Sequence, residues 1–171
     1  MKRLLLSTMF SLLLANAAQA SHIAIYSDAT GAGCNLAPGF STTATILEKF
    51  STGSTASRFK MDLSLCPGTA FFAFQTPFAA PTIGSLTSDL SVGYGVCLTG
   101  TIVIGNIIAS WAPGAVSIVP ADGQTIIQVA DCNFTVYPAT GGHTSINGDG
   151  HGCDFDAVQP STWGGVKALY R

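Results

Sequence analysis

The chain has 171 residues and a formal net charge of −2, and only 9% of its residues are charged, whereas about a quarter is usual for a soluble domain. The sequence contains no cluster of Lys and Arg, so it lacks the basic surface that nucleic-acid binding requires, and we expect no nucleic-acid partner. A surface covered by Ser, Thr, Asn, Gln and Gly instead is common on extracellular sheet proteins.

The first 20 residues have the three parts of a secretory signal peptide. Lys2 and Arg3 form a basic start, residues 4–15 form an apolar run, and the motif AQA ending at Ala20 is a cleavage site. The run is shorter than the roughly 20 residues that span a bilayer. We therefore expect cleavage after Ala20, export to the periplasm or the extracellular space, and no transmembrane anchor afterwards. Residues 21–171 then form a single domain.

Apolar and polar residues alternate with a period of two, which is the spacing of half-buried β-strands. Residues 57–65 (SRFKMDLSL) place four apolar side chains, from Phe59 to Leu65, on one face, and residues 22–27 (HIAIYS) repeat the pattern. Further strands are expected at 43–50, 70–75, 90–98, 101–110, 115–119, 125–130 and 134–138.

Clusters of Gly, Pro, Asn, Ser and Asp separate these segments and read as turns, among them residues 51–55 (STGST). Eight or nine short strands at this spacing predict an all-β fold, an antiparallel β-sandwich of the immunoglobulin or cohesin-like kind. Residues 161–171 (STWGGVKALYR) are expected to add a short helical turn or a strand at the C-terminus.

Five cysteines remain after cleavage, and in an exported chain they indicate disulfides. Five choices of the odd thiol and three pairings of the rest give fifteen arrangements, among which the sequence alone does not choose. We favour a Cys97–Cys132 bridge between two strand-like segments and a Cys34–Cys66 bridge between two loop edges. Cys153 would then be the odd thiol.

Several short motifs follow one another along the mature chain: HIAIYSD, GAGCNL, GSTASRFKMDLS, VGYGVCLTG, IIQVADCNF and TWGGVKALYR. As an ordered set they resemble a family of small exported bacterial proteins that is functionally uncharacterised. The resemblance spans nearly the whole mature chain and implies an exported β-rich fold, but no activity and no catalytic residues. The family's additional cysteines are missing here from residues 112–124 and from the positions after Cys153. The segment GSTASRFKMDLS also resembles the entry to an amphipathic strand in cohesin-like sandwiches.

Residues 141–156 (GGHTSINGDGHGCDFD) contain the densest group of side chains that could bind a metal or take part in catalysis. His143, Asp149, His151 and Asp154 are candidate ligands for zinc or copper. A partial match to a calcium loop fails at its last position, where the bidentate Glu is missing. Asn, Asp and Gly are also the residues that tight turns require, so we expect a turn and no bound cofactor, with calcium or zinc as the alternative.

Catalytic motifs are missing from the sequence. It has neither G-x-S-x-G nor H-E-x-x-H, and only His22, His143 and His151 could act as a base for a serine nucleophile. Glu48 is the sole glutamate, and no pair of carboxylates suited to glycoside hydrolysis can be identified. An oxidising compartment disfavours a cysteine nucleophile. We therefore expect that the protein is not an enzyme.

Exposed aromatic residues would suit a sugar-binding sandwich, and Trp111, Trp163 and Tyr94 are the candidate platforms, although Trp is more often buried. The preferred hypothesis is an exported, non-catalytic structural or interaction module whose partners are other envelope or extracellular proteins. Its sparsely charged strand edges make self-association possible. The alternative is a glycan-binding module, followed by a metal-binding protein or small hydrolase that uses residues 141–156.

Overall fold

The computed structural model describes residues 21–33 and 35–146, which form ten β-strands and no helix. No helix that could cross a membrane occurs among them. The strands are β1 (His22–Tyr26), β2 (Asn35–Leu36), β3 (Gly39–Asp62), β4 (Ala70–Gln75), β5 (Thr82–Ser85), β6 (Asp89–Trp111), β7 (Gly114–Val119), β8 (Ile127–Ala130), β9 (Val136–Gly141) and β10 (His143–Ile146). The expected C-terminal helical turn or strand at 161–171 lies outside the described residues.

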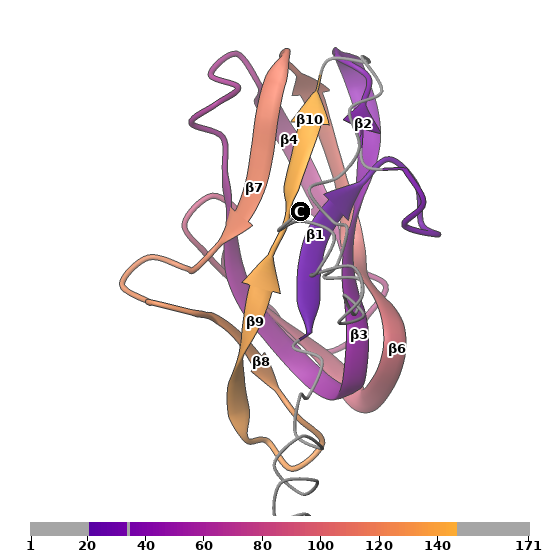
Figure 1. Ribbon diagram of the computed structural model, residues 1–171, viewed down its shortest axis with the longest axis vertical. Coiled ribbons are helices and arrows are strands. Elements are labelled where there is room, and N and C mark those ends of the chain that lie inside the picture. The colour runs from indigo at the N-terminus through magenta and orange to yellow at the C-terminus, as the bar shows by residue number, and fades with distance from the viewer. Residues whose placement is uncertain (1–20, 34, 147–171) are drawn as a thin grey trace, which may run out of the picture.

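Two strands of more than 20 residues organise the fold. β3 has 24 residues and β6 has 23, and they pair antiparallel along most of their length. β1 and then β8 pair with the other side of β3, while β4 and β5 pair with the other side of β6. Residues 60–62 at the end of β3 pair with β7 instead, and β7 continues through β10 to β2 in the second layer (Figure 1).

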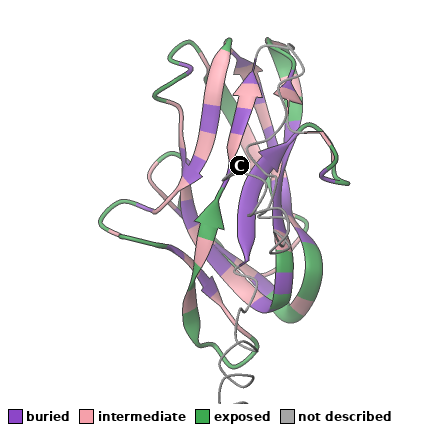
Figure 2. Cartoon of the chain, in the orientation of Figure 1, coloured by how far each residue is buried: buried purple, intermediate pink, exposed green. Residues whose placement is uncertain are grey.

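The core lies between the two layers. Phe59 and Met61 of β3 are at most 2% exposed, whereas Arg58 and Lys60 between them are partly exposed, so the predicted alternation of this strand is confirmed from Arg58 to Met61. Figure 2 shows the same banding of buried and more exposed residues along β7 and β10. The predicted all-β sandwich is confirmed, with two parallel pairs, β1–β9 and β2–β10, in an otherwise antiparallel arrangement.

The predicted turn at residues 51–55 is wrong, because these residues continue β3. The register between β3 and β6 shifts at several points between Glu48 and Ala56, and Phe50 and Gly53 have positive φ. A β-bulge inserts residues into one strand and bends it without ending the pairing, and it uses the same Gly and Ser residues as a turn. The expected strands at 90–98 and 101–110 are likewise joined in β6.

β1 is buried on both faces, whereas its alternation predicted one face in water. The three residues assigned to water are at most 2% exposed: His22, Ala24 and Tyr26. Ala24 and Tyr26 pack with Leu47 of β3. The Nζ atom of Lys49 lies 4.4 Å from the centre of the Tyr26 ring and donates a hydrogen bond to the carbonyl of Gly31 at 2.6 Å. The loop after β1 therefore folds back over this face.

The cysteine pairing is partly as expected. Cys97 and Cys132 form a disulfide with a Cα–Cα distance of 5.3 Å. Cys66 is a free thiol that is fully buried in the core, and burial raises the pKa of its thiol, so the expected Cys34–Cys66 bridge is wrong. Cys34 and Cys153, the expected odd thiol, lie outside the described residues.

The Cys97–Cys132 bridge joins residues that are 35 positions apart. A loop of that length should stabilise the fold by about 3–4 kcal/mol, because the bridge restricts the unfolded chain. We expect Cys97→Ala/Cys132→Ala to lower the free energy of unfolding by this amount in a urea titration. Dithiothreitol should lower the stability of the wild type and of the control Cys66→Ala, but not that of the double variant. Equal unfolding midpoints with and without the bridge would contradict this.

Candidate interaction surface

The free side of β6 carries an uncharged strand edge. Among the described residues, β4 and β5 each pair only with β6. No Asp, Glu, Lys or Arg occurs from residue 70 to residue 85, and the two prolines of this segment lie between the strands. Phe71, Phe72 and Ile83 are 38%, 49% and 67% exposed. An edge of this kind presents unpaired backbone groups beside apolar side chains, and lacks the charges that usually protect an edge strand.

An exposed aromatic pair lies at one end of this edge. Phe40 at the start of β3 is 81% exposed and Phe72 of β4 is 49% exposed. Their ring centres are 5.6 Å apart in an edge-on arrangement, which is a geometry that aromatic pairs prefer. Both residues lie at register shifts, and Ser41 beside Phe40 has a φ of 56°. The bulges therefore place two large rings in water, where they are available to a partner. We refer to Phe40, Phe71, Phe72 and Ile83 as the β4–β5 edge surface.

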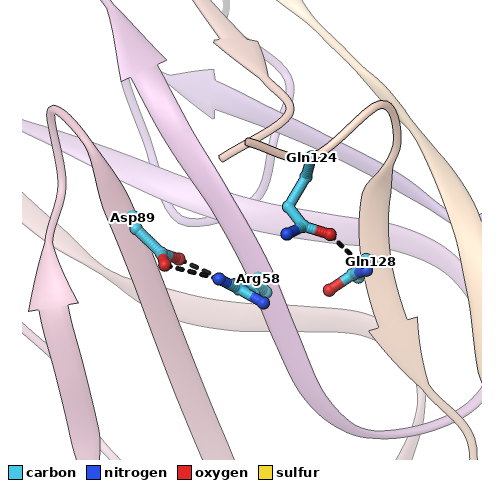
Figure 3. Close-up of polar contacts among 4 residues, drawn as sticks. All are labelled: Arg58, Asp89, Gln124 and Gln128. Carbon is cyan, nitrogen blue, oxygen red and sulfur yellow. Dashed lines mark hydrogen bonds and ion pairs between the residues drawn. The ribbon is translucent and has the colours of Figure 1, made fainter. Parts of the chain in front are cut away.

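A shallow hollow of about 160 Å³ lies over β3, β6 and β8. Arg58 donates two hydrogen bonds to the carboxylate of Asp89, at 2.7 and 2.5 Å, and Gln128 donates one to Gln124 at 2.9 Å. Figure 3 shows the Arg58 guanidinium between Asp89 and Gln128. The ion pair lowers the pKa of Asp89 and raises that of Arg58. The hollow is smaller than the roughly 300 Å³ of small-molecule pockets.

Two of the three aromatic residues proposed as sugar platforms are buried. Trp111 is 2% exposed and packs in the core, and Tyr94 is 3% exposed. The Tyr94 hydroxyl donates a hydrogen bond to Glu48 at 2.8 Å. Both expectations are corrected, because an inward-facing ring on β6 cannot stack on a ligand in solvent. Trp163 lies outside the described residues. No sequence pattern indicated that phenylalanines would be the large exposed aromatic residues of the described region.

Of the candidate metal ligands, only His143 lies in the described part of the chain. It belongs to β10 rather than to a turn, and its Nδ1 atom is 3.0 Å from Oγ of Ser117. Across residues 21–33 and 35–146, no group of three or more His, Cys, Asp or Glu residues could hold a metal ion. Asp149, His151 and Asp154 lie outside this region, so the expectation of a turn there remains a prediction.

Three residues of the types that form a serine hydrolase triad lie side by side on neighbouring strands. Asp62, Ser117 and His143 are directly opposite one another on β3, β7 and β10. In a serine hydrolase the histidine lies between the carboxylate and the serine. Here Ser117 occupies the middle strand, and Asp62 accepts a hydrogen bond from the Ser64 backbone at 2.9 Å. The row therefore lacks the order that would let Asp62 orient the imidazole.

No protein-family model and no curated protein matches this chain. Among solved structures, a cohesin module from a Clostridium perfringens family 33 glycoside hydrolase is similar, with a TM-score of 0.51 over 75% of this chain and 97% of that module, at 7% identity. A chain of a CaDoc0917–CaCohA2 complex at pH 5.5 has a TM-score of 0.46 over 74% of this chain and 99% of its own length, at 9% identity. The likeness to the cohesin module concerns the fold alone, and it confirms the predicted cohesin-like sandwich.

His22 should make folding stability depend on pH. Burial, followed by the nearby charge of Lys49, lowers the pKa of His22 from 6.5 to about 4. Between these pH values the unfolded chain takes up a proton that the folded chain does not, so stability falls as the pH falls from about 6.5 to about 4, by at most about 3 kcal/mol. Urea unfolding at a series of pH values should show this loss, and His22→Asn should reduce it. A loss of the same size in His22→Asn would contradict the assignment.

Proposed function

We propose that the protein is an exported, non-catalytic β-sandwich that binds other proteins at the cell envelope or outside the cell, and that the β4–β5 edge surface is where it binds them. The signal-peptide pattern and the ordered motifs support export. The observation that carries the binding role is a strand edge with no charged residue between positions 70 and 85 and with exposed phenylalanines along it.

A second copy of the same chain is the partner that best fits this edge. An antiparallel pair of β4 strands would satisfy the free backbone groups on both sides, and a two-fold arrangement places the same surface on each copy. The edge carries no charge, so two copies of it do not repel one another. The exposed Phe40–Phe72 pair would then be covered by apolar groups of the second molecule.

Charge placed on the edge should abolish this association. We expect the mature wild type to form larger species as its concentration rises in sedimentation velocity experiments, and Phe72→Lys/Ile83→Lys to weaken the association at least tenfold. Val136→Lys is the matched control, because Val136 is 56% exposed but lies on β9, which is joined through β8 to the side of β3 away from β6. A wild type that stays monomeric at millimolar concentration, or a control that is affected equally, would contradict the proposal.

A glycan-binding role is the second candidate, and the hollow beside Arg58 favours it. Arg58, Ser91 and Gln128 border the hollow, and its lining is mainly apolar, with Ala56, Ala130 and Val136 offering a surface on which a sugar ring could rest. We expect any glycan found on an array to bind more weakly to Gln128→Ala than to the wild type, and Trp111→Phe to have no effect since Trp111 is buried. An array without hits would rule this role out.

A further inference from the structure

Glu48 is an ionisable side chain in the interior of the sandwich. It lies on β3, is 0% exposed, and both of its carboxylate oxygens accept hydrogen bonds from hydroxyl groups. Ser54 donates to Oε1 at 2.5 Å, and Tyr94 of β6 donates to Oε2 at 2.8 Å. Burial and the neighbouring carboxylate raise the pKa of Tyr94 well above 10, so its hydroxyl remains a donor.

A chain of hydroxyl groups leads from Glu48 to Ser21. Ser54 has a single hydroxyl proton, and when it gives this proton to Glu48 its oxygen can accept from the Tyr137 hydroxyl at 3.2 Å and from the Ser51 hydroxyl at 2.7 Å. The Ser21 hydroxyl lies 3.4 Å from Tyr137 and can donate in turn. The hydroxyl protons of this chain can then all be directed towards Glu48. That arrangement suits an ionised carboxylate, which only accepts hydrogen bonds.

The described residues provide no cation for this carboxylate. Their ion pairs are Arg58–Asp89 and Lys60–Asp122. Lys49 follows Glu48 on β3, so it projects from the opposite face of the sheet, where it contacts Gly31 and Tyr26. A buried charge without a partner of opposite sign is costly, so a positive charge placed near Glu48 would stabilise its ionised form.

The backbone nitrogen of Ser21 is the group that could carry such a charge. Glu48 is directly opposite Ile23 in the β1–β3 ladder, and Ser21 precedes Ile23 by two residues, so it is on the same face and is a diagonal neighbour of Glu48. Ser21 is 1% exposed, and its carbonyl accepts a hydrogen bond from Thr140 of β9 at 2.9 Å. Its backbone is therefore held inside the fold, and its hydroxyl is linked to the carboxylate through the hydroxyl groups of Tyr137 and Ser54.

The geometry points to Glu48 as the buried acceptor for the α-ammonium group of Ser21, which forms when the leader is cleaved after Ala20. In the precursor this nitrogen is a neutral amide, and after cleavage it is a cation. Hydrolysis of the Ala20–Ser21 peptide bond consumes one water and leaves the new carboxylate on the departing leader, so one positive charge is added beside Glu48. The sandwich would then reach its full stability only in the processed form. The inference depends on the cleavage site and not on the proposed binding role.

The test is a double-mutant cycle on residues 21–171, prepared by removing a fusion partner so that Ser21 is the first residue. Free and Nα-acetylated forms are compared in the wild type and in Glu48→Gln by urea unfolding at pH 7. We expect the free amine to raise the folding equilibrium constant at least tenfold in the wild type and less than twofold in Glu48→Gln. Asp89→Asn, which breaks the Arg58 ion pair instead, is the matched control and should keep the tenfold effect.

The pH dependence of the α-amine gives a second measurement that does not require the variant to fold. The titratable groups around Ser21 and Glu48 are Tyr94 of β6, Tyr137 of β9 and, on the opposite face of the β1–β3 pair, His22 and Lys49. Pairing should raise the α-amine pKa above its ordinary value of about 8 and slow its acylation in the native protein. The added stability should be complete below about pH 8 and disappear as the pH rises through the raised pKa. Equal stability of the free and acetylated forms, or an amine that titrates and reacts as in the unfolded chain, would overturn the inference.

Discussion

The pairing of β3 with β6 is the constraint on which the rest of the molecule depends. Both strands exceed 20 residues, so each has a second side long enough for two further strands, one after the other. Because β3 continues into a pairing with β7, the same strand also connects the two layers. The side of β6 away from β3 is left to β4 and β5, which are short and uncharged. The edge surface is therefore a direct consequence of this ladder.

The bulges that bend the ladder also create the polar interior. Register shifts fall between Glu48 and Ser51, between Ser51 and Ser54, and between Ser54 and Ala56. Each shift changes which side chains face inward, and as a result Ser51 and Ser54 are buried beside Glu48 instead of alternating with it. Gly53 in the same stretch has a positive φ, and a Cβ atom there would lie 2.6 Å from Sγ of Cys132. The bend, the carboxylate and the disulfide thus depend on one short segment.

The sequence was sufficient for the fold class because alternation within one strand is a local property. It was not sufficient for strand length, because residues 51–55 have the composition of a turn and only their pairing with β6 shows that they form a bulge. Burial on both faces of β1 depends on a loop that folds back over it. Glu48 was recognisable only as the sole glutamate, since its hydroxyl partners are 6 and 46 positions away. Trp111 and Tyr94 are buried because they project from the inward face of β6. Residue type alone does not determine which face of a strand a side chain occupies.

Stability alone gives a poor reason for a carboxylate at position 48. Apolar residues of similar volume usually replace buried ionic groups without loss of stability, whereas one charged partner without the other is strongly destabilising. An apolar residue here would stabilise the chain equally before and after removal of the leader. Under the proposed pairing with Ser21, a carboxylate would distinguish the two forms, because the α-ammonium group exists only in a chain cleaved after Ala20. If the uncharged edge pairs as proposed, this distinction would let a fully stable sandwich present that edge only after the proposed removal of the leader.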